Sequence, residues 1–214
     1  MKGIIVEDIR LPRLMLNSIR GVYSFYKHQE AKIRIRNLIK AKQEIWLDVG
    51  NGDTGKDGWI TVDITKNCDI FWDLRRGLPF PDESISKIYS SHFLEHLSFR
   101  GGQRFLEECL RVLVHSGTFS ICVPDARLYI EAYLKGSPLD DFCKYRPAYN
   151  NTTKIDYVNY MAYMDGHHNY MFDEENLLFI LKSAGFRNVH VRQFNPDLDI
   201  KQRDYESIYA EAEK

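Results

Sequence analysis

Two short apolar runs, each carrying an acidic residue near its end, constrain the fold of this chain more than any other feature. The first run is Ile45–Val49, which contains Asp48 and leads directly into the turn Gly50–Gly52. The second run is Ile60–Asp63. Short apolar runs are typical of strands that are covered on both faces, and glycines let a turn take positive φ while a ligand approaches the backbone. The pattern predicts two strands of an α/β sheet with a ligand site at their carboxyl ends.

The acids and glycines predict a nucleoside ligand that carries a positive charge. Asp63 follows the glycine turn by about one strand, where α/β sheets bind the hydroxyls of a ribose. Gly50, Gly52 and Gly55 have the spacing of a dinucleotide site, but residues 51–58 are too few for the helix that would hold a pyrophosphate. Asp48 would repel a phosphate and attract a cation. The sequence therefore favours S-adenosylmethionine (SAM), and a nicotinamide oxidoreductase ranks last.

The overall charge excludes a general attraction to polyanions. The 214 residues carry a net charge of −1, which favours neither nucleic acid nor an anionic membrane surface. The charge is uneven, because eight Lys or Arg residues lie between Leu11 and Lys42 against the single acid Glu30. We interpret this basic stretch as the solvated face of a helix, with contact to an acidic partner as the alternative.

Cysteine spacing and the absence of long apolar runs predict a cytoplasmic protein without a membrane span. The four cysteines are widely spaced, with no C-x-x-C pair and no His placed to complete a zinc site with them, so no metal site is expected. Residues 1–10 contain Glu7 and Asp8 and no long apolar run, which does not fit a signal peptide. No stretch of 18 apolar residues occurs. The sequence leaves a homo-oligomer open.

Alternating strand and helix patterns predict a mostly parallel sheet in one domain of good size. Helices are expected over 11–42 (as two segments), 102–112 and 173–184, and a turn over 115–117. Strands are expected over 44–49, 59–63, 69–72, 86–90, 118–123, 188–194 and 205–210. This divides the chain into a helical extension, 1–43, and a main domain, 44–214. Within the latter, residues 125–170 hold eight of the 13 tyrosines and form an insertion.

Five segments, in order, carry a resemblance to a known family. They are Leu47–Gly52, Gly58–Asp63, Leu78–Leu97, Glu108–Asp125 and Gly166–Phe186. The fourth segment contains the sequences Leu-Arg-Val-Leu and Val-Pro-Asp. These segments resemble the class I SAM-dependent methyltransferases, in particular a small bacterial branch with Gly-Trp-Ile-x-Val-Asp and Leu-Glu-His signatures. The resemblance implies a Rossmann-like α/β fold: a seven-stranded, mostly parallel sheet with helices on both faces and an antiparallel last strand.

The resemblance also implies which residues contact SAM. The methionine end would lie on the glycine turn and its neighbours, the ribose on the second strand, the adenine beyond the third, and the methyl-transfer site beyond the fourth. In that order, these residues are Asp48, Val49, Gly50, Asn51 and Gly52; Asp63 and Ile64; Asp73 and Leu74; Ser91 and His92. Asn51 departs from the branch, which usually has Cys there, although Asn tolerates the left-handed conformation of such a turn.

Methyl transfer needs a base only to remove a proton from a hydroxyl or to keep an amine neutral. Histidine suits this task near neutral pH, and His92 is the first candidate because it ends a strand. His96 and His167 are further catalytic candidates, with a structural role as the alternative for each. The tyrosine-rich insertion is expected to cover the substrate or to form the core of an added subdomain. Candidate substrate contacts are Asp125, Tyr129, His168 and Tyr170.

The expected function is methyl transfer from SAM to a small-molecule or saccharide acceptor at oxygen. One alternative is a non-catalytic SAM-binding module, motivated by Asn51 and the short first crossover. The other is a nucleic-acid methyltransferase that uses the basic stretch, for which affinity would fall steeply with salt. Nucleic acid is not the expected partner, because the chain lacks the Asn/Asp-Pro-Pro-aromatic motif of amino-directed enzymes.

Overall fold

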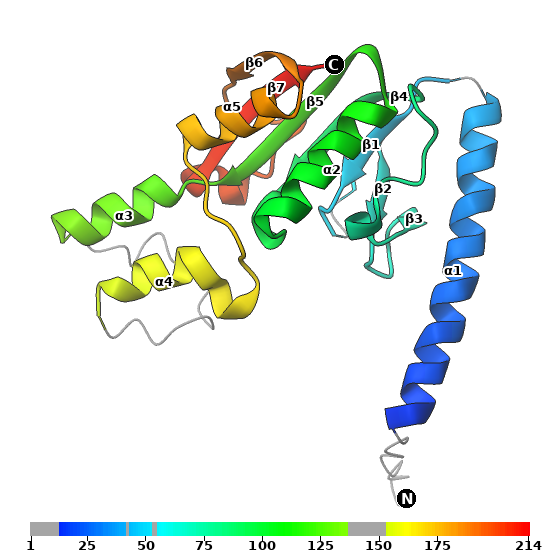
Figure 1. Cartoon of the computed structure of the whole chain (residues 1–214), viewed down its shortest axis with the longest axis horizontal. Helices are drawn as coiled ribbons and strands as arrows, with labels where there is room; N and C mark the ends of the chain where they lie inside the picture. Colours follow the sequence, from blue (N-terminus) through cyan, green and yellow to red (C-terminus); the bar gives the residue numbers. More distant parts are fainter. Residues whose placement is uncertain (1–12, 42, 53–54, 137–152) are drawn as a thin grey trace, which may run out of the picture.

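Seven strands form one sheet in the order β3-β2-β1-β4-β5-β7-β6 (Figure 1). The computed structural model describes residues 13–41, 43–52, 55–136 and 153–214. The strands are β1 Trp46–Val49, β2 Ile60–Asp63, β3 Ile70–Phe71, β4 Ile85–Ser91, β5 Leu113–Pro124, β6 Arg187–Val191 and β7 Ser207–Glu213. Strands β1 to β5 pair in parallel, and β7 runs antiparallel to both β5 and β6. The predicted Rossmann-like sheet with an antiparallel last strand is confirmed.

The main core lies between the sheet and two neighbouring helices. Strand side chains alternate between the two faces of a sheet, and on one face Leu47, Val49, Phe119 and Ile121 are fully buried. Helices α2, Phe99–Val112, and α5, Glu174–Ser183, lie in front of the sheet in Figure 1. Their apolar residues complete the same core: Phe105, Leu106, Cys109, Val112, Leu177 and Leu181. Burial of these side chains supplies most of the free energy that holds the sheet and helices together.

Helix α1, Arg13–Ala41, is continuous, so the predicted break into two segments is wrong. An isolated glycine such as Gly21 costs a helix only about 1 kcal/mol relative to alanine and does not end it. The helix lies along the β3 edge of the sheet (Figure 1), where Ala31 and Ile35 are buried in the main core. None of the described helices has the length and apolar character that a membrane span requires.

Two cations of the basic stretch have partners within the chain. Arg34 donates to Asp69 at 2.7 Å, across to the residue before β3, and Lys27 pairs with Glu30 at 2.7 Å. Exposed pairs of this kind contribute little stability, typically less than about 1 kcal/mol. The pairing fits the interpretation of a solvated helix face.

Two element boundaries differ from the predicted ones for local reasons. Helix α2 begins at Phe99, before the predicted residue 102, because the Ser98 hydroxyl accepts a hydrogen bond from Gly101 N and caps the first turn. Strand β5 runs through the predicted turn at 115–117, because Ser116 takes a φ of +61° and the pairing with β4 shifts register near the start of the strand. An irregularity of this kind bends a strand without ending it.

The described part of the tyrosine-rich insertion contains two helices that pack on each other beyond the end of β5 (Figure 1). They are α3, Ala126–Lys135, and α4, Ile155–Tyr163. Their contact forms a second core, made of Ala126, Tyr129, Ala132, Tyr157, Tyr160 and Met161. Three of the tyrosines are therefore core residues of an added subdomain. Tyr145 and Tyr149 lie outside the described residues.

Helix α5 offers a direct test of local stability. The Asp173 carboxylate accepts from Asn176 N and caps the helix as predicted, and the first turn also holds Glu174 and Glu175. We expect Asp173→Ala to lower the free energy of unfolding by about 1 kcal/mol. The control Glu174→Ala removes only a favourable charge near the helix N-terminus and should cost a few tenths of that, about 0.3 kcal/mol. Urea unfolding of both variants checks this, and equal losses would argue against a cap.

Candidate active site

The carboxyl ends of β1, β2 and β4 meet at one edge of the sheet, where parallel α/β sheets bind ligands. Asp63 ends β2 there, and three backbone N–H groups fix its carboxylate. Gly52 N donates to Oδ2 at 3.0 Å, while Ile64 N and Thr65 N donate to Oδ1 at 2.6 and 3.1 Å. A carboxylate offers about four acceptor positions, so the bonds from described residues leave one position on Oδ2 for a ligand hydroxyl.

Asp63 opens onto a cavity of about 380 Å³, here called the Asp63 cavity. Its wall combines the ends of β2 and β3 with the segment after β4 and the segment after α4. The lining includes Asp63, Ile64, Asp73, Leu74, Phe93, His96, His167 and Asn169. The structure thus brings the predicted ribose and adenine residues together. This volume is in the range of nucleoside-sized ligand sites.

A second cavity of about 390 Å³, here called the His92 cavity, adjoins the first at His96, which lines both. Its wall comes from the segment after β4, from α4 and the turn after it, and from the residues that precede β7. The lining includes His92, Glu95, His96, Tyr160, Met164, His168, Arg203, Tyr205 and Glu206. Segments distant in sequence therefore form two cavities that share His96 in their walls.

His92 is held in a conformation that few residues adopt. Its φ is +49°, in the left-handed region, and its backbone N–H donates to Cys122 O at 2.9 Å. Such backbone strain concentrates at functional sites, where the surrounding structure maintains it. In this protein the strained residue directly follows β4, and its ring lies on the wall of the His92 cavity.

The hydrogen bonds of the His92 ring define which nitrogen is free to accept a proton. Nε2 lies 2.8 Å from Ser207 Oγ, and that hydroxyl donates its own hydrogen to Arg203 O at 2.6 Å. Nε2 must therefore donate to Ser207, which leaves the lone pair on Nδ1. Burial, with a smaller contribution from Arg203, lowers the pKa of His92 to about 3. The ring is neutral at physiological pH, and Nδ1 is a proton acceptor.

The glycine turn lies close to both acids, but the structure gives Asp48 an internal cation. Asp48 is buried, and its Oδ2 accepts from Lys56 Nζ at 2.9 Å and from Asn51 Nδ2 at 3.2 Å. Burial raises the pKa of Asp48, although Lys56 opposes this effect. Among the described residues, Asp48 Oδ1 has no hydrogen-bond partner. The Asn51 side chain therefore helps to hold the buried Asp48 carboxylate.

Gly50 and the remaining predicted cofactor residues do not line the Asp63 cavity. Gly50 has a φ of +74°, and a Cβ built there would lie 2.2 Å from the Phe93 ring, so only glycine fits. Gly52 also has positive φ and donates to Asp63. Val49 and Ser91 are buried and do not appear in the lining of either cavity.

The other predicted site residues separate into those within the site and those outside it. His167 lines the Asp63 cavity, and its carbonyl accepts from His96 Nδ1 at 2.8 Å. His168 lines the His92 cavity and donates from Nδ1 to Met161 O at 2.7 Å. Tyr129 is buried in the second core, and its hydroxyl donates to Glu206, a residue of the His92 cavity.

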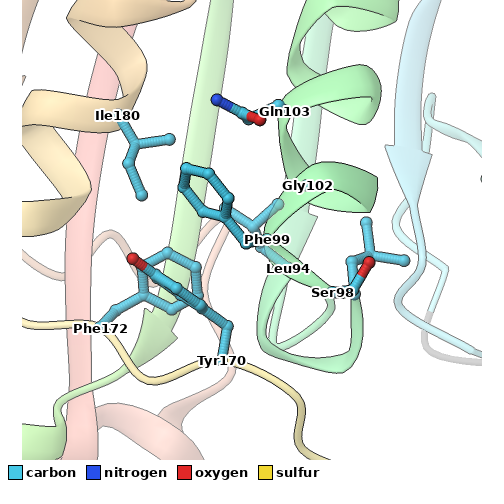
Figure 2. A pocket seen from close by; sticks show the side chains of 9 residues that line it. Leu94, Ser98, Phe99, Gly102, Gln103, Tyr170, Phe172 and Ile180 are labelled. Carbon is cyan, nitrogen blue, oxygen red and sulfur yellow. The ribbon is translucent and has the colours of Figure 1, made fainter.

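Asp125 and Tyr170 have structural positions. The Asp125 carboxylate accepts from Arg127 N and caps α3. Tyr170 faces Phe99 and Ile180 in an apolar groove between α2 and α5 (Figure 2). Its ring centroid lies 5.7 Å from that of Phe99, at a tilt, and 5.0 Å from that of Phe172, edge to face. Neither residue lines the His92 cavity.

Sequence reasoning missed four residues that shape the site. Lys56 neutralises Asp48, and Glu95, Arg203 and Glu206 line the His92 cavity. Glu95 is fully buried, and this burial raises its pKa to about 8. An acid between two histidines in His92–His96 was a visible signal for Glu95. Arg203 and Glu206 precede a strand far along the chain, and nothing in the sequence links them to His92.

Comparisons with known proteins agree with this geometry. Residues 69–121 match the family described as "Methyltransferase domain". No curated protein matches the chain. A SAM-dependent methyltransferase from Archaeoglobus fulgidus has 16% identity and a TM-score of 0.50, with 90% of this chain and 99% of that chain covered. Phosphoethanolamine N-methyltransferase 2 of Haemonchus contortus, solved with SAM, has 13% identity and a TM-score of 0.51, with 85% of this chain and 51% of that chain covered.

The family match covers residues 69–121, whereas the structural similarities cover most of the chain. The structural similarities, at these low identities, establish the fold, and this chain spans about half of the Haemonchus enzyme. The matched segment contains β4 and α2 and therefore carries His92, Glu95 and His96. The chain thus carries a segment that matches a methyltransferase domain, within a fold similar to that of SAM-dependent methyltransferases.

Proposed function

We propose that the chain methylates a hydroxyl group of a small-molecule or saccharide acceptor. The proposal assigns the Asp63 cavity to SAM and the His92 cavity to the acceptor. One observation carries it: the two cavities adjoin at His96, so a nucleoside site and a histidine-lined polar site lie side by side. Placing two reactants in adjoining sites is the main contribution an enzyme makes to a displacement reaction.

The chain's residues would hold the cofactor by charge and shape. Asp63 Oδ2 would accept from a ribose hydroxyl, while Ile64 and Leu74 would border the nucleoside. Asp48 Oδ1 has no hydrogen-bond partner in the described part of the chain, and it would suit a cationic group at the methionine end. When bound, SAM supplies a methyl group that is already activated for transfer.

His92 is the proposed base. Geometry supports this role: Nδ1 keeps its lone pair on the wall of the His92 cavity, where it would accept the proton of an acceptor hydroxyl as the oxygen becomes a nucleophile. The lowered pKa keeps the ring neutral but makes it a weaker base than an exposed histidine. His96, between the cavities, would orient the acceptor, since its Nδ1 is fixed by His167 O. His167 itself, on the Asp63 side, is proposed to border the cofactor.

The polar lining of the His92 cavity supports a hydroxylated acceptor. Gln202, Arg203 and Glu206 offer donors and acceptors on one side, and His168 does so on the other. Helix α4 and the turn after it contribute Tyr160 and Met164. We therefore propose that the insertion at 125–170, within the domain 44–214, helps to bind the acceptor. Residues 137–152 of the insertion lie outside the described residues.

Isothermal titration with SAM and S-adenosylhomocysteine, followed by transfer of labelled methyl groups to a panel of acceptors, tests the proposal. The panel contains sugars and small alcohols, matched amines, and RNA and DNA. We expect SAM binding and labelling of a hydroxyl acceptor. Binding without transfer to any acceptor would favour the non-catalytic alternative. Labelling of RNA or DNA alone, with salt-sensitive affinity, would favour the nucleic-acid enzyme.

A further inference from the structure

Three side chains on the wall of the His92 cavity converge on one point. Glu95, His96 and His168 each offer one ligand atom, and these atoms lie within 4.8 Å of one another. His96 Nε2 is 3.9 Å from Glu95 Oε1, and the two imidazole rings meet edge to face with centroids 5.2 Å apart. Sequence spacing predicted no metal site, because residue 168 is distant from residues 95 and 96 along the chain.

The two histidines present lone pairs to this point. His96 Nδ1 donates to His167 O at 2.8 Å, and His168 Nδ1 donates to Met161 O at 2.7 Å. A carbonyl oxygen only accepts, so both rings carry their hydrogen on Nδ1 and their lone pair on Nε2. Histidine ligands of metal ions are commonly held in this way, with the second ring nitrogen donating to a backbone carbonyl.

Glu95 gives the second, independent observation. Its side chain is 2% exposed, and neither carboxylate oxygen has a hydrogen-bond partner among the described residues. Within 4.0 Å of the carboxylate, the described ionisable partners are His92 and His96. A buried carboxylate without a donor or a paired cation is costly, so such a group either keeps its proton or binds a cation such as a metal ion in the proton's place. Arg203 lines the same cavity, but its guanidinium is directed to Ser91 Oγ at 3.4 Å.

The backbone fixes the two segments that carry these ligands. Asn169 N and Tyr170 N both donate to Glu95 O, at 2.8 and 3.2 Å, and the Asn169 side chain donates to His96 O at 2.9 Å. These bonds hold His168 beside the turn that carries Glu95 and His96. His96 is 37% exposed, which leaves an entry path for an ion.

We propose that Glu95, His96 and His168 bind a divalent first-row transition-metal ion such as Zn²⁺. Two imidazole nitrogens and one carboxylate oxygen are a ligand set of open transition-metal sites, which keep a position for a further ligand. Bonds of about 2.1 Å in a tetrahedral site separate ligand atoms by about 3.4 Å. The arrangement here reaches that spacing through small side-chain adjustments, for which the partly exposed His96 has room. Mg²⁺, which prefers oxygen ligands, fits less well.

The site deepens the proposed function, and this consequence rests on that function. A hydroxyl bound to such an ion has a lowered pKa. His92 Nδ1 lies 3.7 Å from Glu95 Oε1, so the proposed base borders the ion's position and would accept the hydroxyl proton. Metal binding itself depends neither on SAM nor on an acceptor.

The test begins with chelator-treated full-length protein and titration with Co²⁺, read from visible absorption, with Zn²⁺ competition read by calorimetry. We expect one ion per chain, the absorption of a nitrogen- and oxygen-ligated Co²⁺, displacement by Zn²⁺, and no displacement by equimolar Mg²⁺. Glu95→Gln and His168→Ala should each weaken binding more than about 10-fold, since even removal of a residue that supports a ligand costs that much. His167→Ala is the matched control, because it keeps the carbonyl that orients His96.

Circular dichroism and thermal unfolding establish that each variant is folded. If Glu95→Gln does not fold, His168→Ala carries the comparison. Failure of the wild type to bind Co²⁺ or Zn²⁺, or equal affinity in the ligand variants and the His167→Ala control, would overturn the proposal. Methylation of a hydroxyl acceptor is then measured with and without the ion. Metal binding without any methylation would refute the proposed acceptor class and leave the metal site intact.

Discussion

Asp63→Ala should weaken SAM binding by about 1–3 kcal/mol, the cost of leaving buried hydroxyls without a partner. In the dissociation constant this is about 5- to 150-fold. The reason is local: Asp63 is the acid of the Asp63 cavity whose carboxylate is already oriented by Gly52, Ile64 and Thr65. Isothermal titration of SAM into the purified wild type and variant measures this dissociation constant.

The control for this prediction is Asp57→Ala, which removes an exposed acid from the same crossover. It should bind SAM as the wild type does. Asp63→Asn separates the structural role of Asp63 in the turn from its proposed role in ribose binding. The amide oxygen of Asn can still accept from the backbone N–H groups of the turn. Wild-type affinity in a folded Asp63→Ala protein would remove the ribose role from Asp63.

His92→Asn should lower turnover by roughly 10²-fold or more while SAM affinity is retained. Asparagine tolerates the left-handed backbone that His92 adopts at φ +49°, so this variant removes the base with little added strain. SAM affinity should persist because His92 lines the His92 cavity and not the Asp63 cavity. Single-turnover rates and SAM titration together check both parts.

His115→Asn is the matched control for His92. Its side chain is 82% exposed near the start of β5, away from the carboxyl ends of the strands, and turnover should not change. A loss of less than about 10-fold in His92→Asn would show that the enzyme works by positioning its acceptor and not by proton transfer through His92.

The sequence predicted the sheet and the nucleoside side of the site because both depend on local patterns. Apolar runs located the strands, and Asp63 and His92 were placed by their positions at strand ends. The relation of Asp48 to Lys56 was not predictable in this way, since a lysine in a short crossover has no fixed direction. The continuity of α1 was missed because an approximate 3–4 spacing does not determine where a helix breaks.

The acceptor side was only partly predictable, because it depends on contacts between distant segments. Candidate residues Tyr129, Asp125 and Tyr170 were chosen from their place in the insertion, and the structure gives them a core, a capping and a groove position. Glu95 and His168 meet because the backbone at residues 169 and 170 bonds to Glu95 O. No spacing rule contains that pairing.

The most direct test of the two-cavity account is a crystal structure of the protein with S-adenosylhomocysteine. The account predicts that the ribose hydroxyls bond to the Asp63 carboxylate, with the adenine near Asp73 and Leu74 and the sulfur facing His92 and His96. A nucleoside bound elsewhere, or one whose sulfur points away from the His92 cavity, would contradict it.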